Sequence, residues 1–453
     1  MRLLTTDGLF PWNKLPDSPD LIALKQLLDQ LPDAKLLAAL RLWRGRGRND
    51  FPMHVCWRIH MGRYFLRHPT MEAMLAELGR NPALRPVVGI EAGQAVPDAW
   101  NMSRFLSVLG RAEHGVLMTA MFEEMSRSLA ELVADLGRHL AGDSAGLTAR
   151  PSGRADDGDS AGLPLAAGGR KEYTDADQKV VRVCEWFGYK FHLLVDTKYE
   201  VIMAAKISSA AGEGSGDVSV LPALVEQAKR ILPEGRMATL AYDMAADDGD
   251  SHKLLAKEKI KPLIQIRNLW KDQTEMMLPG HDGNSNVVYD EAGTLHCYNV
   301  ISDPPVRQKM AYMGHEMNRG TLKYRCPARH GGWDCPSDKR CNGESCYGKT
   351  VRVKSDLDLR RFPPIPRATM EFERRYKGRT AVERVNGRVK VYWGADDGNV
   401  TGTARFHAHL GSILLVHASM ALWLAGQPRY EGKSLSPTRL SPIARKLARP
   451  APR

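Results

Sequence analysis

The first part of the chain alternates apolar and polar residues with the period of an α-helix. Leu21, Leu24, Leu28 and Leu31 fall on one face of a helix. Similar stretches follow, separated by clusters of proline and glycine. We therefore predict a helical N-terminal domain over residues 1–137.

After that domain the pattern changes to short runs of β-branched and aromatic residues, which predict strands. The predicted strands are residues 139–147, 187–195, 200–207, 238–242 and 261–266. Residues 149–178 are rich in Gly, Asp, Ser and Ala and are expected to be a loop. Amphipathic helices are expected at residues 220–232 and 251–258. This order predicts a mixed α/β sheet over residues 138–267, in which three antiparallel strands are followed by parallel βα units.

The regular alternation is lost over residues 268–369, where short strand-like pieces lie among many turns. We interpret this segment as an insertion. Apolar helical periodicity returns at residues 370–392 and 406–424, so residues 370–426 are expected to complete the core with helices. Residues 427–453 carry seven Lys and Arg against one Glu and are expected to be a basic tail.

Composition narrows the function. The chain has 453 residues, and its 64 Lys plus Arg against 52 Asp plus Glu give a formal net charge of +12. This surplus favours an acidic partner, with nucleic acid first. Seven cysteines are too few, and odd in number, for a disulfide framework. The longest apolar run, residues 410–425, is shorter than the roughly 20 residues that cross a bilayer, and no signal peptide is recognisable at the N-terminus, so we expect a cytoplasmic protein without a membrane partner.

One stretch of the sequence carries candidate chemistry more clearly than any other. Tyr376, Arg379, Glu383 and Lys390 follow the spacing Y-x2-R-x3-E-x6-K. Separations of 3, 4 and 7 residues would place all four side chains on one face of a helix. Taken alone, the pattern is explained equally well by an ordinary ion pair between Arg379 and Glu383 on a solvated helix.

Two further carboxylates lie where an α/β sheet would present them. Asp143 is inside the first predicted strand, and Asp243 ends the fourth. A buried acid is costly unless it is paired or binds a metal. Three carboxylates at one sheet edge can hold two divalent cations, which activate a hydroxyl nucleophile and stabilise a leaving oxygen in phosphodiester chemistry. The neighbouring Asp247 and Asp248 are expected to begin a helix instead.

With its spacing met at every position, the Glu383 signature resembles that of bacterial insertion-sequence DDE transposases. Residues 187–196 resemble the second-strand block of that family, residues 241–243 followed by Asp247 its second-aspartate block, and residues 97–105 part of its N-terminal domain. The resemblance implies an α/β RNase H-like catalytic core, a mixed sheet flanked by helices, with a helical N-terminal domain and an insertion before the last catalytic helix.

The resemblance implies that Asp143, Asp243 and Glu383 are the catalytic triad and hold two Mg²⁺ ions, for which Mn²⁺ can substitute. Asp196 is an alternative for the first position, because the family usually has Gly-Thr or Ser-Thr after its first aspartate whereas Ser-Ala follows Asp143. We prefer Asp143, because Asp196 lies at a hairpin turn, where aspartate is common for turn reasons alone.

By the same resemblance, Tyr376, Arg379 and Lys390 would contact DNA near the cleaved phosphate. Arginine and lysine bind phosphates, and an aromatic ring can stack on an unpaired base. Arg388 and Arg384 are further candidates for backbone contacts, although a solvated charged face explains these two equally well.

The implied function is that of a transposase that binds double-stranded DNA at the terminal inverted repeats of an insertion sequence, cleaves it and joins it to a target. Two ends must be brought together, so a homodimer is expected in the DNA complex. The N-terminal helices would then either bind DNA ends and dimerise or only pack on the core. Two other functions remain open: a metal-dependent nuclease without strand transfer, and an inactive DNA-binding relic or regulator.

Four cysteines lie close together in the predicted insertion. Cys326, Cys335, Cys341 and Cys346 fall within 21 residues, which predicts a tetrahedral zinc site that would stabilise a segment with little core of its own. His330 could replace one of these ligands. The spacing lacks a CxxC pair, so a set of reduced, partly buried cysteines is the alternative.

Overall fold

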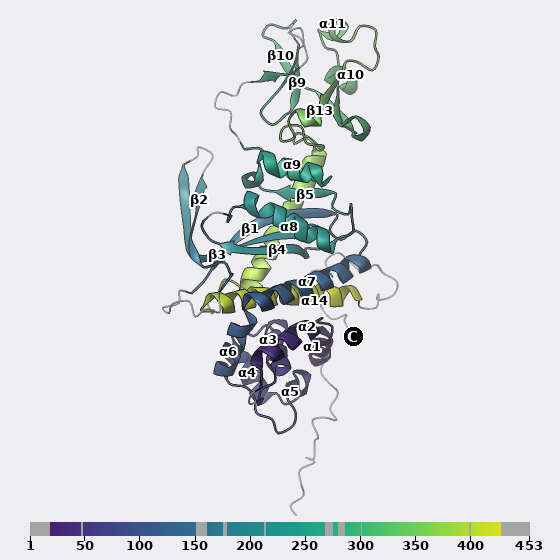
Figure 1. Ribbon diagram of the computed structural model, residues 1–453. Coiled ribbons are helices and arrows are strands. Elements are labelled where there is room, and N and C mark those ends of the chain that lie inside the picture. Colours follow the sequence, from purple (N-terminus) through teal and green to yellow (C-terminus); the bar gives the residue numbers. More distant parts are fainter. Residues whose placement is uncertain are drawn as a thin grey trace, which may run out of the picture.

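The computed structural model shows an elongated molecule with a β-sheet at its middle (Figure 1). The α1–α6 helices lie at one end of the molecule and the insertion lies at the other. The structure describes residues 19–46, 49–150, 161–174, 179–212, 214–267, 275–279, 286–299, 301–397 and 400–426.

The N-terminal part is helical, as predicted. Its helices are α1 (Pro19–Asp29), α2 (Ala34–Arg44), α3 (Met53–Leu66), α4 (Met71–Arg80), α5 (Leu84–Val87), α6 (Ala99–Leu109) and α7 (Ala112–Leu132). Two of them begin at a side-chain cap, since Thr70 Oγ1 accepts from the Ala73 amide at 3.1 Å and Asp98 Oδ1 accepts from the Asn101 amide at 2.8 Å. The leucines with helical spacing in α1 are buried, which confirms that this face points into a core.

The central sheet is mixed. Its strands are β1 (His139–Thr148), β2 (Ala167–Thr174), β3 (Val180–Asp196), β4 (Ile202–Ser209), β5 (Thr239–Tyr242) and β6 (Lys261–Ile264). The strand order is β2-β3-β1-β5-β6, and β4 also pairs with β3. Strand β3 is antiparallel to β1, β2 and β4, whereas β5 is parallel to both β1 and β6. Three antiparallel strands followed by parallel strands were expected, and this mixed sheet is consistent with an RNase H-like domain.

The loop expected over residues 149–178 is wrong in part, because it contains β2. This strand pairs with the first half of β3, and the two form a ribbon that extends beyond the sheet (Figure 1). The β2 sequence lacks the apolar alternation of a half-buried strand, so its pattern did not predict it. Trp186 of β3 covers two glycines here, and a Cβ at Gly146 or Gly169 would lie 2.7 or 2.5 Å from its ring.

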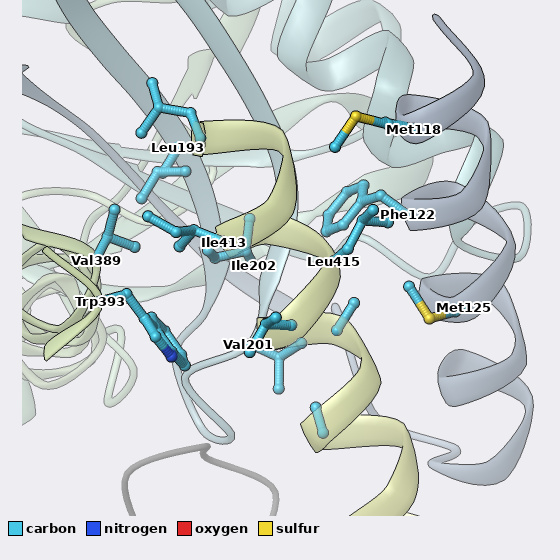
Figure 2. Close-up of a cluster of buried hydrophobic side chains, with 14 of the residues drawn as sticks. Met118, Phe122, Met125, Leu193, Val201, Ile202, Val389, Trp393, Ile413 and Leu415 are labelled. Atoms are coloured by element: carbon cyan, nitrogen blue, oxygen red, sulfur yellow. The ribbon is translucent and has the colours of Figure 1, made fainter. Parts of the chain in front are cut away.

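Helix α14 (Thr403–Gly426) joins the sheet to the N-terminal helices. Figure 2 shows Ile413 facing the strand residues Leu193 and Ile202, whereas Leu415 faces Phe122 of α7. By length and composition α14 could cross a membrane, but 67% of its most apolar window is buried inside the protein, as expected for a core helix. The N-terminal helices and the sheet therefore share one hydrophobic core.

Two buried hydrogen bonds fix α14 to α3. Ser412 Oγ lies 2.8 Å from His60 Nε2, and Tyr64 Oη lies 2.6 Å from His409 Nδ1. Burial lowers the pKa of His409 to about 3, so its ring is neutral and its Nδ1 can accept a hydrogen bond from the Tyr64 hydroxyl.

The insertion has a second, smaller core that contains Leu295 and Leu322. One of its sheets consists of β7 (Met276–Met277), β8 (Val287–Tyr289), β9 (Leu295–Asn299) and β10 (Val306–Lys309), and the other of β11 (Ala311–Glu316), β12 (Thr321–Arg325) and β13 (Thr350–Lys354). Two short helices follow β12, namely α10 (Pro327–Gly331) and α11 (Asp338–Asn342). The division into the five predicted domains stays a prediction, but the separate core supports a structural unit here.

Two helices pack on the sheet, α8 (Asp217–Ile231) on the antiparallel strands β4 and β3, and α9 (Gly249–Lys257) on β6. Asp248 begins α9 as predicted, and its Oδ2 accepts from the amides of Asp250 and Ser251. Asp247 does not begin that helix. Its buried carboxylate accepts from the Arg267 amide and from Arg360 Nε, both at 2.7 Å, so it joins the α9 region to the last part of the insertion.

The charge of Asp247 is stabilised by its partners. Burial raises the pKa of this carboxyl, but hydrogen bonds from His252 and Arg360 outweigh burial and hold the pKa well below its usual value. Arg367, which is also largely buried, lies 3.7 Å from the other carboxylate oxygen. Loss of this one carboxylate would leave buried cations without their counter-charge.

We expect Asp247→Ala to lower the free energy of unfolding by about 3–5 kcal/mol, because breaking one side of a buried ion pair leaves the other charge uncompensated. Asp248→Ala, which removes only a helix cap, should cost about 1 kcal/mol. Because the pKa of Asp247 is depressed in the folded protein, its contribution is present above the unfolded value of about 3.9 and is lost as the pH falls below it. Urea unfolding at pH 7 and pH 3 measures both effects, and equal losses for the two variants at pH 7 would contradict the anchoring role.

Candidate active site

Two of the three predicted carboxylates are brought together by strand pairing. Leu140 pairs with Leu240 and Ala141 with Ala241 in the parallel β1–β5 ladder. Continued by two residues, this register sets Asp143 beside Asp243, with both side chains on the same face of the sheet. The two acids, 100 residues apart in the sequence, are therefore neighbours because β1 and β5 are neighbours.

The residue before each aspartate explains how the two strands fit. A Cβ at Gly142 would lie 2.0 Å from the ring of Tyr242, so the absence of a side chain on β1 gives the tyrosine its space. The chain then turns after β5 into the 3-10 helix η2 (Met244–Ala246), and Asp243 Oδ1 caps this turn by accepting from the Ala245 amide at 2.8 Å. Asp243 is therefore held at the end of its strand.

The charge of Asp143 depends on its surroundings. Burial raises the pKa of this carboxyl to about 6, the Arg379 guanidinium opposes the rise, and the negative charge of Asp243 adds to it. Lys171 on the β2–β3 ribbon also favours the charged form. The signature arginine and the second aspartate are thus both within electrostatic reach of Asp143.

The third carboxylate comes from a segment that changes its helical form three times. The segment consists of α12 (Met370–Tyr376), the 3-10 helix η5 (Lys377–Arg379), α13 (Thr380–Gly387) and the π-helix η6 (Arg388–Tyr392). The single continuous helix expected over residues 370–392 is therefore wrong in detail. Gly378 faces Thr197, and a Cβ at this position would be in ordinary van der Waals contact with it at 3.4 Å.

This segment carries the signature side chains to the aspartates. Arg379 Nη2 lies 2.6 Å from Glu383 Oε1, which is the ion pair expected for this spacing. Burial raises the pKa of Tyr376, and the charges of Arg379, Asp243 and Glu383 all act on its hydroxyl. Tyr376 is thus within electrostatic reach of Asp243 and Glu383, and Arg379 is within reach of Asp143.

The chemistry of this donor set fits a hard divalent cation. Carboxylate oxygens suit Mg²⁺ and Mn²⁺, and Asn386 Oδ1 beside Asp143 is buried without a hydrogen-bond partner among the described residues. Within those residues, no group of three or more His, Cys, Asp or Glu side chains is placed to hold a metal ion. The ion pair with Arg379 explains why Glu383 is not placed as a metal ligand, because it directs the Glu383 carboxylate to the guanidinium.

Lys390 lies further along β1 than the acids. Its Nζ is 3.0 Å from Asp396 Oδ2, and Asp396 Oδ1 accepts from the Thr148 amide at 2.6 Å. Thr148 is five residues beyond Asp143 on the same strand. The signature lysine therefore stands at the end of β1, paired with Asp396, rather than beside the aspartates.

The contact of Arg388 with DNA stays a prediction, although its side chain does not lie on the surface. Arg388 is buried and forms an ion pair with Glu200, and burial lowers its pKa to about 10. Arg384 binds the same glutamate, with Nε 2.6 Å from Oε1. The spacing alone did not reveal that the face of the helix beyond Glu383 turns inward toward the β3–β4 turn.

Asp196, the alternative first aspartate, has a different role. It is buried where β3 ends, and its Oδ1 accepts from the amides of Lys198 and Tyr199 at 2.9 and 2.7 Å. Its Oδ2 accepts from the Gly137 amide at 2.8 Å. These three hydrogen bonds occupy the carboxylate in shaping the turn, which favours Asp143 as the first acid of the site.

The cysteines of the insertion group differently from the prediction. Cys326, Cys335 and Cys341 line a small cavity of about 30 Å³ together with Cys297 from β9, whereas Cys346 is exposed and lies outside that lining. Burial, reinforced by the other three thiols, raises the pKa of Cys297 to about 11. Zinc binding stays a prediction, because the described side chains are not arranged as a metal site.

Thiol alkylation distinguishes the cavity lined by Cys297 from a zinc site that includes Cys346. We expect iodoacetamide at pH 8 to modify Cys346 at least about tenfold faster than Cys297, because the thiolate is the reactive form and Cys297 is half-buried with a raised pKa. Peptide mass spectrometry over a time course measures both rates. If Cys346 were a zinc ligand, as its spacing predicted, it would be protected until a chelator is added.

Comparison with known families agrees with this arrangement. The mixed sheet and its flanking helices are consistent with an RNase H-like DDE type of domain. A family model described as a transposase DDE domain matches residues 136–418, and one described as a transposase domain of the DUF772 type matches residues 13–107. No curated protein matches the chain. Since the first match covers well over half of the sequence, the chain belongs to the DDE transposase family of insertion sequences.

Proposed function

We propose that this transposase binds the terminal inverted repeats of an insertion sequence, cleaves the DNA at those ends and transfers the strands to target DNA. The observation that carries the proposal is the register of β1 against β5, which sets Asp143 beside Asp243, with Glu383 brought close by α13. The proposed place of action is the cytoplasm, where chromosomal DNA lies.

Asp143, Asp243 and Glu383 would hold two Mg²⁺ ions, or Mn²⁺ in their place. When bound, such ions activate a water or a 3′-hydroxyl and stabilise the leaving oxygen of a phosphodiester. For Glu383 to reach them, it must leave Arg379. The guanidinium, then without its carboxylate, is free to bind a DNA phosphate, so one side-chain exchange would couple metal binding to substrate binding.

The remaining signature residues would hold the DNA. Tyr376 is half-buried against Phe372, with the ring centroids 5.5 Å apart, and it can present its free edge to a base or sugar near the cut. Lys390 could follow the backbone away from the carboxylates, along the line of β1. The net positive charge of the chain would add salt-dependent affinity, and a homodimer would hold two ends together.

Cleavage of DNA that carries the ends of the element tests this function. We expect Mg²⁺-dependent nicking and joined products from the wild-type protein. Glu383→Gln, Asp143→Asn and Asp243→Asn should each lower the cleavage rate on the order of 10³-fold or more and leave end binding intact, since catalytic groups that act together fail together. Asp250→Asn, at an exposed acid on α9 paired with Lys253, is the matched control and should cleave normally.

The products distinguish the alternatives. Metal-dependent cutting without joined products would make the protein a nuclease. Specific binding of end DNA with no cutting by the wild-type protein would mean that the chain is a DNA-binding relic or regulator.

A further inference from the structure

A fourth polar side chain reaches the carboxylates from α13. Asn386 follows Glu383 by three residues, so the two stand about one turn apart on the same side of the helix. Its side chain is buried, with the residue 7% exposed, and Nδ2 donates to Asp143 Oδ2 at 3.4 Å. The Y-x2-R-x3-E-x6-K spacing does not include this position, and the sequence analysis did not select it.

The amide is left with one atom unsatisfied. An ionised carboxylate only accepts hydrogen bonds, so the NH₂ group of Asn386 must face Asp143 and Oδ1 must point elsewhere. Oδ1 is buried and has no hydrogen-bond partner among the described residues. An unpaired buried carbonyl costs about 1–3 kcal/mol, and such a group in a native site calls for an explanation.

The surrounding side chains cannot supply the missing partner as they stand. Asp143 and Glu383 are acceptors when ionised, and the nearby cation Arg379 is bound to Glu383. A neutral carbonyl oxygen between carboxylates is a ligand that Mg²⁺ and Mn²⁺ accept, either directly or through a coordinated water.

We infer that Asn386 is a further residue of the metal site: its Nδ2 positions Asp143, and its Oδ1 binds the divalent cation, directly or through a coordinated water. This inference rests on the proposed function, because without a cation at the carboxylates Oδ1 has nothing to bind. It gives the helix two ligand residues, Glu383 and Asn386, on adjacent turns.

Binding of Mn²⁺ to the full-length protein without DNA tests the inference by isothermal titration calorimetry. Asn386→Ala should weaken Mn²⁺ binding about 10- to 100-fold, the usual effect of losing a supporting group at a metal site. Asn386→Asp should bind Mn²⁺ at least as tightly as the wild-type protein, because the introduced carboxylate also offers an oxygen. The matched control is Asn299→Ala, at an equally buried asparagine of the insertion, which should leave Mn²⁺ binding unchanged.

Thermal unfolding of the same variants adds a readout that a purely structural role would not move. Without metal, Asn386→Asp should unfold at a lower temperature than the wild type, because its carboxylate faces Asp143. Added Mn²⁺ should raise its midpoint by more than it raises that of the wild-type protein. For Asn386→Asp we therefore expect a lower stability without metal together with undiminished Mn²⁺ affinity.

Two results would overturn the inference. Asn386→Ala that binds Mn²⁺ like the wild type would show that Oδ1 is not part of the site. Asn386→Asp that binds as weakly as Asn386→Ala would reduce Asn386 to a donor for Asp143.

The proposed function fails separately, if the wild-type protein itself binds no Mn²⁺ or if Asp143→Asn binds it unchanged.

Discussion

The pairing of β1 with β5 is the constraint on which the rest of the structure depends. It makes β1 the centre of the sheet, antiparallel to β3 on one side and parallel to β5 on the other. It also places Asp143 beside Asp243 in a largely buried position, where burial and the negative charge of Asp243 both raise the pKa of Asp143. Two neighbouring negative charges of this kind are electrostatically unfavourable in the protein alone. A bound cation would offset them.

Arg379 compensates part of that negative charge. It lowers the pKa of Asp143 and holds Glu383 in an ion pair at 2.6 Å. The same guanidinium therefore stabilises both carboxylates, and in the proposed mechanism it would be released when Glu383 turns to a cation. A half-exposed position suits this exchange, since the Glu383 side chain is 48% exposed and moves at little cost.

The remaining architecture holds this site between two cores. Helix α14 ties the sheet to the N-terminal helices through one continuous apolar core, so these helices are part of the scaffold of the catalytic sheet. The insertion has its own smaller core and joins the sheet region through the buried carboxylate of Asp247. An ion-pair cluster at Asp247 thus helps to connect the two units close to Asp243, only four residues earlier in the chain.

The sequence by itself determined the elements whose apolar periodicity is strong and the residues whose spacing is specific. The helical N-terminal part and the order of the strands follow from local pattern, because a period of two or of 3.6 residues is a property of neighbouring positions. The grouping of Asp143, Asp243 and Glu383 came from the family resemblance and stays a prediction. Strand β2 escaped prediction, because its stabilisation comes from pairing with β3 rather than from an apolar face. Only the tertiary structure decided that Arg388 is buried against Glu200, that Asp196 shapes a turn, that Cys297 rather than Cys346 lines the thiol cavity, and that Asn386 reaches Asp143. Each of these four contacts joins segments that are distant in the sequence. Tertiary packing decides which distant segments meet, and the spacing of neighbouring residues carries no information about it.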